Sequence, residues 1–320
     1  MIMIVNTKPS YKAAIKGRTE PVRNSALITK LHLRRGFTLM ELLAVIVVAG
    51  FGVVVLTPAL ARTQPASKSF QCLNNHRQLV NAWRMYSADN NDRVANNFGI
   101  PDTLNAINTG RLNNWVNNVM SWGASSSDSD RGNTNLVWFT NGVLGKYADA
   151  PVSAYRCPAD IYLSPPQKAS GWTARLRSVS MNSVFGRFSD GNDSTAQGLN
   201  WALPQYLQYL KCVQVQKPVK TWLFIEEHPD SINDGYYLNS TTATSWGDIP
   251  ASYHNGGCTF SFADGHAEIR KWLSVTSQYP VKFFYPATRV FDSPGRLDFA
   301  WYLERSGYID ARTGLLQFGN

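Results

Sequence analysis

The sequence lacks the short motifs that mark many hydrolases and nucleotide-binding enzymes. It has no His-Glu-x-x-His zinc motif, no serine nucleophile elbow and no glycine-rich phosphate loop. Charged residues are scarce, at 17%, and no internal repeat is visible. Apolar residues make up 44% of the chain, which is enough to bury a core. We therefore expect a folded protein that is not an enzyme and has no catalytic residue.

Acidic residues are nearly absent from the first 36 positions. This segment holds eight of the 31 basic residues and one of the 22 acidic residues, which leaves 23 basic and 21 acidic residues for the rest of the chain. The net charge of +9 therefore belongs mainly to the N-terminal segment. A nearly neutral body argues against a nucleic-acid partner, and a basic segment before an apolar run is typical of a membrane topology signal.

Residues 37–57 form a long apolar run in which only Thr38, Glu41 and Thr57 are polar. A helix of this length spans roughly 30 Å, the thickness of a bilayer hydrocarbon core. A buried helix of a soluble core is the alternative, but such helices rarely lack a polar face over this length. The preceding basic residues predict a single-pass protein with a cytoplasmic leader, residues 1–36, and an exported chain after about residue 60.

The start of the run resembles the cleavage and methylation site of type IV prepilins and type II secretion pseudopilins. The matching residues are Arg34-Arg35-Gly36-Phe37-Thr38-Leu39-Met40-Glu41-Leu42-Leu43. The resemblance implies cleavage after Gly36 by a prepilin peptidase, followed by N-methylation of Phe37. It also implies that Glu41 pairs with the Phe37 amine of a neighbouring subunit during fibre assembly. The implied partners are other pilin-like subunits and an inner-membrane assembly platform, and the implied location is the inner membrane with a periplasmic head.

An ordinary secretory signal is the competing interpretation. Ala59-Leu60-Ala61 offers a small-x-small cleavage site, and Arg34-Arg35 has some likeness to a twin-arginine signal. Against it, the apolar run is longer than the usual core of ~7–15 residues. A carboxylate such as Glu41 at membrane depth also costs roughly 2.5–3.5 kcal/mol without giving a signal peptide any benefit.

A second helical pattern follows the run and predicts a stalk helix within residues 58–90. From about Ser67 to Asp89, one stripe recurs at spacings of three and four residues. The stripe consists of Cys72, His76, Leu79, Trp83 and Tyr86. We expect it to pack on an exported head formed by residues 91–320, with Arg77 and Arg84 facing outward.

The head is rich in Asn, Ser, Gly and Asp, broken by short runs typical of strands. We expect strands at 177–183, 219–226, 258–263, 266–272 and 281–285. Asp264-Gly265, between two alternating runs, predicts a tight hairpin turn. The expected fold is α+β, with a long N-terminal transmembrane and stalk helix followed by an antiparallel sheet, as in pilins.

Further residues resemble a signature of the large pilin-like proteins of planctomycete and verrucomicrobial type. Their C-terminal pattern is a His, nine residues and then Asp-Gly, and His254 precedes Asp264-Gly265 with that spacing. Cys72-Leu73-Asn74-Asn75 and Cys157-Pro158 belong to the same resemblance. It implies no catalytic mechanism.

The four cysteines suit an oxidising compartment and allow three pairings. We favour a disulfide between Cys72 and Cys157, which would tie the stalk to the head. Cys258 falls in an expected core strand, where a cysteine serves as a small apolar residue.

The densest group of titratable side chains is a candidate metal site. It consists of Glu226, Glu227, His228, His254, Asp264 and His266. Two histidines with carboxylates can bind zinc, but we favour a structural hydrogen-bond cluster over a metal, and a metal over a hydrolase. No cofactor is expected, although a structural calcium in the loops stays open, with Asp128 and Asp130 or Asp190 and Asp193 as ligands among backbone carbonyls and with no location indicated.

A pilin-like structural subunit is therefore the favoured function. The alternative is a membrane-tethered, exported protein that binds carbohydrate or metal, and a metal-dependent hydrolase is less favoured. The carbohydrate alternative rests on tryptophans in loop-like stretches, where they can stack on sugar rings or fill the core. These tryptophans are Trp115, Trp122, Trp172 and Trp246.

Overall fold

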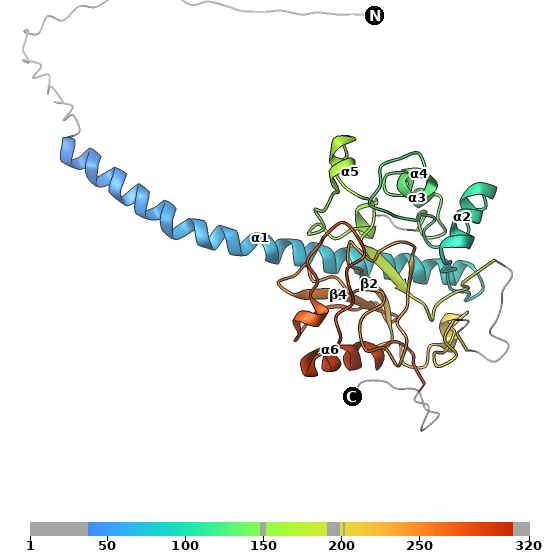
Figure 1. The fold of residues 1–320 in the computed structure, drawn as a ribbon. Helices are drawn as coiled ribbons and strands as arrows, with labels where there is room; N and C mark the ends of the chain where they lie inside the picture. Colours follow the sequence, from blue (N-terminus) through green and yellow to red (C-terminus); the bar gives the residue numbers. More distant parts are fainter. Residues whose placement is uncertain (1–37, 148–151, 191–198, 201, 310–320) are drawn as a thin grey trace, which may run out of the picture. The chain divides into compact units, whose positions relative to one another are not determined.

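The computed structural model describes residues 38–147, 152–190, 199–200 and 202–309, and within 51–67 it describes the backbone only (Figure 1). The α-helices are α1 (Leu39–Asp89), α2 (Ile100–Thr109), α3 (Asp128–Arg131), α4 (Leu136–Thr140), α5 (Pro165–Ala169) and α6 (Ser293–Leu303). The 3-10 helices are η1 (Val152–Tyr155), η2 (Cys212–Gln214) and η3 (Val275–Ser277). The strands are β1 (Val179–Asn182), β2 (Trp222–Glu226), β3 (Tyr236–Tyr237), β4 (Gly257–Phe262) and β5 (Ala267–Lys271).

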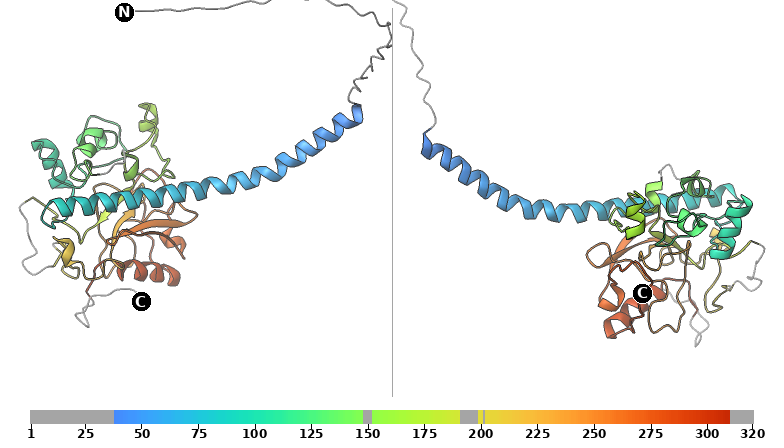
Figure 2. Two further views of the ribbon diagram at one scale, coloured as in Figure 1. Left: turned by 180° about the vertical axis from the view of Figure 1, so that it is seen from behind. Right: turned by 45° about the horizontal axis from the view of Figure 1, so that its top comes forward.

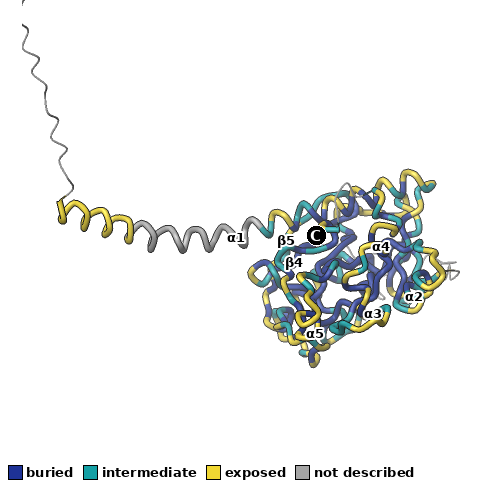
Figure 3. Tube along the Cα trace, turned by 90° about the horizontal axis from the view of Figure 1, so that it is seen from above, coloured by how far each residue is buried: buried dark blue, intermediate teal, exposed yellow. Residues whose placement is uncertain are grey.

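The chain divides into two units, Met1–Val54 and Val55–Asn320. In the first unit, the side chains described at the start of α1 are exposed (Figure 3). Within the described residues, no helix has the length and apolar character needed to cross a membrane. Phe37 and the side chains of 51–57 lie outside that description. The transmembrane segment 37–57 therefore stays a prediction, as does the cytoplasmic position of residues 1–36.

The second unit contains a five-stranded sheet in the order β3-β1-β2-β4-β5. The pairs β1–β2, β2–β4 and β4–β5 are antiparallel, whereas β1 and β3 are parallel. The prediction of an α+β fold is confirmed, but a wholly antiparallel sheet is wrong. After β2, the connection 227–235 reverses the chain and passes beyond β1. Strand β3 therefore runs opposite to β2 and parallel to β1.

Both faces of the sheet are covered. Residues 68–89 of α1 lie over one face and α6 lies over the other (Figures 1 and 2). Leu79 and Trp83 of α1 belong to one apolar core, together with Phe224 of β2. Tyr302 of α6 belongs to a second core with Trp222 of β2. Because both of its faces are covered, β2 is buried along its whole length, and four of its five residues are apolar.

The buried stripe predicted for residues 72–86 is confirmed on α1. Cys72, His76, Leu79 and Trp83 are buried, Tyr86 is partly buried, and Arg77 and Arg84 are exposed. The spacing of these residues places them on one side of a helix, so their burial follows from packing this side against the sheet.

The hairpin prediction is also confirmed. Strands β4 and β5 pair from Gly257↔Lys271 to Ser261↔Ala267, and the turn contains Gly265 with a φ of 105°. Only glycine adopts such a φ without strain, which explains the Asp-Gly sequence.

The strand predicted at 281–285 is wrong. The backbone N–H groups of Lys282 and Phe283 donate to the carboxylate of Asp230, at 2.7 and 2.9 Å, in place of pairing with a strand. Phe283 also has a φ of 63°, which interrupts an extended conformation.

Candidate functional site: a buried cysteine, histidine and glutamate cluster

The residues of the predicted processing site are only partly described. Gly36 and Phe37 lie outside the described residues, whereas Glu41 lies in the first turn of α1. Its carboxylate accepts from the backbone N–H of Thr38 at 2.8 Å, and its own N–H donates to the Thr38 hydroxyl at 3.2 Å. This reciprocal pair is a capping box, so Glu41 stabilises the start of α1 locally.

Four potential ligand atoms converge inside the second unit. They belong to Cys72 of α1, Cys157 after η1, Glu226 at the end of β2 and His254 before β4, and they lie within 4.8 Å of one another. The Cys72 thiol donates to Glu226 Oε1 at 2.7 Å. His254 Nε2 lies 3.0 Å from the same oxygen and 3.5 Å from Cys157 Sγ.

The four side chains are inaccessible to solvent, with exposed fractions of 0% for Cys72, Cys157 and Glu226 and 4% for His254. Burial alone would raise the pKa of Glu226, but the hydrogen bond and charge of His254 hold it down, at about 2. Burial would lower the pKa of His254, but its bonds to Cys157 and Glu226 raise it to about 10. Without a metal, the cluster is thus a buried ion pair beside thiols, and burial raises the pKa of the Cys72 thiol well above its ordinary value.

A nucleophilic role for this cysteine–histidine pair is not supported by the geometry. A catalytic thiolate needs access for its substrate and a lowered pKa, whereas Cys72 and Cys157 are fully buried and the pKa of Cys72 is raised. The arrangement can instead hold a metal ion or serve as a structural network.

His76 lies one helical turn after Cys72 on the same buried side of α1. Its Nδ1 lies 3.3 Å from the Ser261 hydroxyl, whereas its Nε2 has no hydrogen-bond partner among the described residues. Burial lowers the pKa of His76 to about 4, so it is neutral at pH 7.

The predicted Cys72–Cys157 disulfide is not formed in the structure. All four cysteines are free, although the sulfur atoms of this pair are within 4.8 Å of each other. The sequence thus selected two neighbouring cysteines out of four, but not their chemical state. Their sulfur atoms also face Glu226 and His254. The resemblance to the large pilin-like proteins includes both cysteines and His254, but it does not include Glu226.

The titratable residues that the sequence groups together are separated in the structure. Glu227 accepts from the hydroxyls of Ser180 and Ser231 at 2.6 and 2.8 Å, and His228 Nε2 lies 2.9 Å from the Tyr279 carbonyl oxygen. Asp264 and His266 contact each other at 2.7 Å in the β4–β5 turn, half-exposed. Of the expected group, only Glu226 and His254 enter the cluster, and the two cysteines complete it.

The aspartates considered for calcium do not gather within the described part of the chain. Asp128 pairs with Arg131 at 3.5 Å, and the carboxylate of Asp130 accepts from Ser121 and Ser125. Asp190 is exposed and Asp193 lies outside the described residues. A structural calcium therefore stays a prediction without a located site.

Two of the loop tryptophans are unable to stack on a sugar. Trp115 and Trp246 are buried in the cores, with exposed fractions of 0% and 1%. Trp122 is partly buried, with Arg175 over its ring at 4.0 Å. Trp172 is likewise only partly buried.

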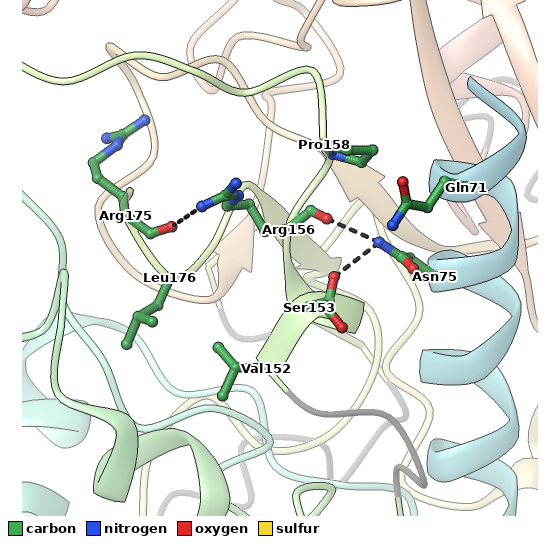
Figure 4. Close-up of a pocket in the computed structure, with 8 residues that line it drawn as sticks. All are labelled: Gln71, Asn75, Val152, Ser153, Arg156, Pro158, Arg175 and Leu176. Carbon is green, nitrogen blue, oxygen red and sulfur yellow. Dashed lines mark hydrogen bonds between the residues drawn. The ribbon is translucent and has the colours of Figure 1, made fainter. Parts of the chain in front are cut away.

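A pocket of about 290 Å³ lies beside the cluster, between α1 and the segment that carries Cys157 (Figure 4). Asn75 Nδ2 donates across one wall to the carbonyls of Ser153 and Arg156, at 2.8 and 2.9 Å. Arg175 also lines the pocket, but its charge is paired with Asp160 at 3.5 Å. Arg156 lines the pocket as well, and its Nη1 donates to the Arg175 carbonyl at 3.4 Å.

Comparisons of the chain with protein-family models, with curated proteins and with solved structures found no match.

Proposed function

We propose that the chain is a pilin-like structural subunit. In this proposal, residues 37–57 anchor it in the inner membrane, residues 1–36 are cytoplasmic and the head is periplasmic. A prepilin peptidase cuts after Gly36, Phe37 becomes the methylated N-terminus, and the subunit joins a type II secretion pseudopilus or a type IV pilus-like fibre.

The observation that carries this proposal is the apolar surface at the start of α1, directly after the prepilin-like motif. Within residues 39–48, eight large apolar side chains each have more than half of their surface exposed. They are Leu39, Met40, Leu42, Leu43, Val45, Ile46, Val47 and Val48. Because they occupy nearly every position, they surround the helix, and such a helix requires an apolar environment. A bilayer supplies one before assembly, and the helices of neighbouring subunits supply one in a fibre.

Glu41 is the exception to this apolar surface. At membrane depth its carboxylate costs roughly 2.5–3.5 kcal/mol unless it has a partner. The capping box with Thr38 satisfies part of its hydrogen-bonding capacity but supplies no positive charge. The amine of Phe37 on a neighbouring subunit would supply that charge, so Glu41 would set the register between subunits.

The separate unit Val55–Asn320 also favours this function, because it has two apolar cores of its own. A domain with its own cores can fold outside the membrane and be carried on the helix into a fibre.

The test is the N-terminus of the mature protein. The full chain is expressed in a bacterial host with and without a prepilin peptidase, and the product is analysed by N-terminal sequencing and intact mass. We expect methylated Phe37 as the first residue only when the peptidase is present. Gly36→Val, which alters the residue before the cut, is the matched control and should stay uncleaved. An N-terminus at Arg62 would support the secretory-signal interpretation and overturn the proposal.

A further inference from the structure

We propose that Cys72, Cys157, Glu226 and His254 form a zinc-binding site that fastens α1 to the head. This inference is independent of cleavage and fibre assembly, because it concerns only the unit Val55–Asn320. It differs from the candidate metal site that the sequence offered as a less favoured alternative, since both cysteines are ligands and Asp264 and His266 are not.

The first argument is geometric. In a tetrahedral zinc site, with Zn–S near 2.3 Å and Zn–N or Zn–O near 2.0–2.1 Å, the ligand atoms lie roughly 3.3–3.8 Å apart. The Cys157 Sγ–His254 Nε2 separation of 3.5 Å has this value already. Glu226 Oε1 lies closer to His254 Nε2 and Cys72 Sγ, at 3.0 and 2.7 Å, because these pairs are hydrogen-bonded. Shifts of roughly 1 Å or less would therefore bring these pairs to ligating distances.

The second argument is that neighbouring groups orient three of the four ligands. The Ser69 hydroxyl lies 3.0 Å from His254 Nδ1, which leaves Nε2 facing the cluster. The Thr259 N–H donates to Glu226 Oε2 at 2.7 Å and leaves Oε1 facing the cluster. The Ala159 N–H donates to Cys157 Sγ at 3.3 Å, a bond that stabilises a thiolate. Protein metal sites use such outer hydrogen bonds to fix the tautomer and direction of their ligands.

The donor set decides which metal fits. Two sulfur atoms and one imidazole nitrogen favour zinc and other borderline or soft ions, whereas calcium and magnesium prefer oxygen ligands. All four ligand positions are taken by protein side chains, and all four are buried, which is typical of a closed structural zinc site.

Zinc would take the place of the thiol protons. With two thiolates and one carboxylate as ligands, its two positive charges would compensate two of their three negative charges. A zinc ion leaves one negative charge. The Lys271 Nζ holds the backbone before β4, because it donates to the carbonyls of His254 and Asn255, at 2.5 and 2.7 Å.

The site would join four segments that are distant in sequence. Cys72 belongs to α1 and Cys157 follows η1. Glu226 is the last residue of β2, and His254 precedes β4. A metal that is bound only in the folded state stabilises that state. Zinc would therefore stabilise the packing of α1, around Cys72, against the sheet.

The experiment measures the metal content of the full chain, purified in detergent without chelator or reductant. Elemental analysis by mass spectrometry is expected to give about one zinc per chain, as for a single structural site. Cys72→Ser and Cys157→Ser should each lower the zinc content roughly tenfold or more, because each removes a ligand. Cys212→Ser is the matched control, since Cys212 contacts Ser87 and is not a member of the cluster.

Two measurements on the unaltered chain keep the test decisive if the serine variants do not fold. Replacement of the bound metal by Co²⁺ should give thiolate-to-cobalt charge-transfer absorption and the intense visible bands of a tetrahedral site. Thiol titration after unfolding with chelator should detect all four cysteines. A chain without zinc that shows only two titratable thiols would establish the Cys72–Cys157 disulfide instead. A chain without zinc and with four thiols would leave the hydrogen-bond network alone, and either result overturns the proposal.

Discussion

Leu79 tests whether the stalk part of α1 is an integral part of the head. Its side chain is fully buried in the core that also contains Trp83 and Phe224. Leu79→Ala removes three carbon atoms, and at ~0.8 kcal/mol for each buried methylene the transfer contribution is about 2.4 kcal/mol. The cavity left behind adds to this, so buried Leu→Ala changes cost ~2–5 kcal/mol. We expect a loss of about 3 kcal/mol in the free energy of unfolding.

The assay is urea unfolding of the full chain in mild detergent, followed by tryptophan fluorescence. Trp83 of α1 and Trp222 of the sheet are both buried, so the signal reports on both parts. With an m-value of ~3 kcal/mol/M, a loss of about 3 kcal/mol lowers the unfolding midpoint by about 1 M. The m-value itself should not change, because the variant unfolds the same structure.

Arg77→Ala is the matched control on the same helix. Arg77 is exposed and donates to Asn74 at 3.3 Å, so its removal should change the stability by less than about 0.5 kcal/mol. If Leu79→Ala were no more destabilising than Arg77→Ala, the packing of α1 on the sheet would be refuted. The same refutation would follow if helix α1 melted at a lower urea concentration than the sheet.

Three further outcomes are expected. Glu41→Val and Glu41→Gln should both be cleaved after Gly36 but should be absent from sheared fibres. Normal assembly of the Gln variant would show that Glu41 acts through its capping box with Thr38 and not through its charge. Burial raises the pKa of Asp234 to about 6, so the folded state keeps a proton that the unfolded state releases from about pH 4 upward. The free energy of unfolding should therefore fall by about 3 kcal/mol as the pH rises from about 4 to 6, whereas that of Asp234→Asn should lack this decrease. The same pH dependence of urea unfolding in both proteins would contradict this. Gly265→Ala forces a φ of 105° on a residue with a Cβ and should cost about 1–3 kcal/mol, measured by the same unfolding assay, whereas a neutral result would place the turn in another conformation.

The elements with strong local signals are the ones that the sequence predicts correctly. The stripe from Cys72 to Trp83 has helical spacing, and the β4–β5 hairpin combines alternation with an Asp-Gly turn. Strand β3 has no such signal, because Tyr236 and Tyr237 form two residues of strand inside a loop-rich stretch. Their pairing with β1 depends on where the connection from β2 returns, which is a tertiary effect.

The cluster was predictable only in halves. The sequence paired Cys72 with Cys157 and named Glu226 and His254 as metal candidates. The resemblance to the large pilin-like proteins includes both cysteines and His254, but it does not indicate that their side chains meet at Glu226. Glu226 was grouped with Glu227, although adjacent residues of a strand point to opposite faces of the sheet. The structure follows this rule, since Glu226 faces the cysteines and Glu227 bonds to Ser180.

His254 and Asp264, the two ends of the His-x9-Asp-Gly pattern in this sequence, flank β4 and both approach α1. His254 lies just before β4 and Asp264 just after it, and α1 contacts both ends: Cys72 shares the cluster with His254, and Arg84 Nη1 donates to the Asp264 carbonyl at 3.0 Å. Between these two ends, His76 Nδ1 of α1 lies 3.3 Å from the Ser261 hydroxyl of β4. One residue inserted into β4 would turn its following side chains to the other face and displace the Asp264 turn from Arg84. The segment from His254 to Gly265 thus has the candidate metal site at one end and the hairpin turn at the other.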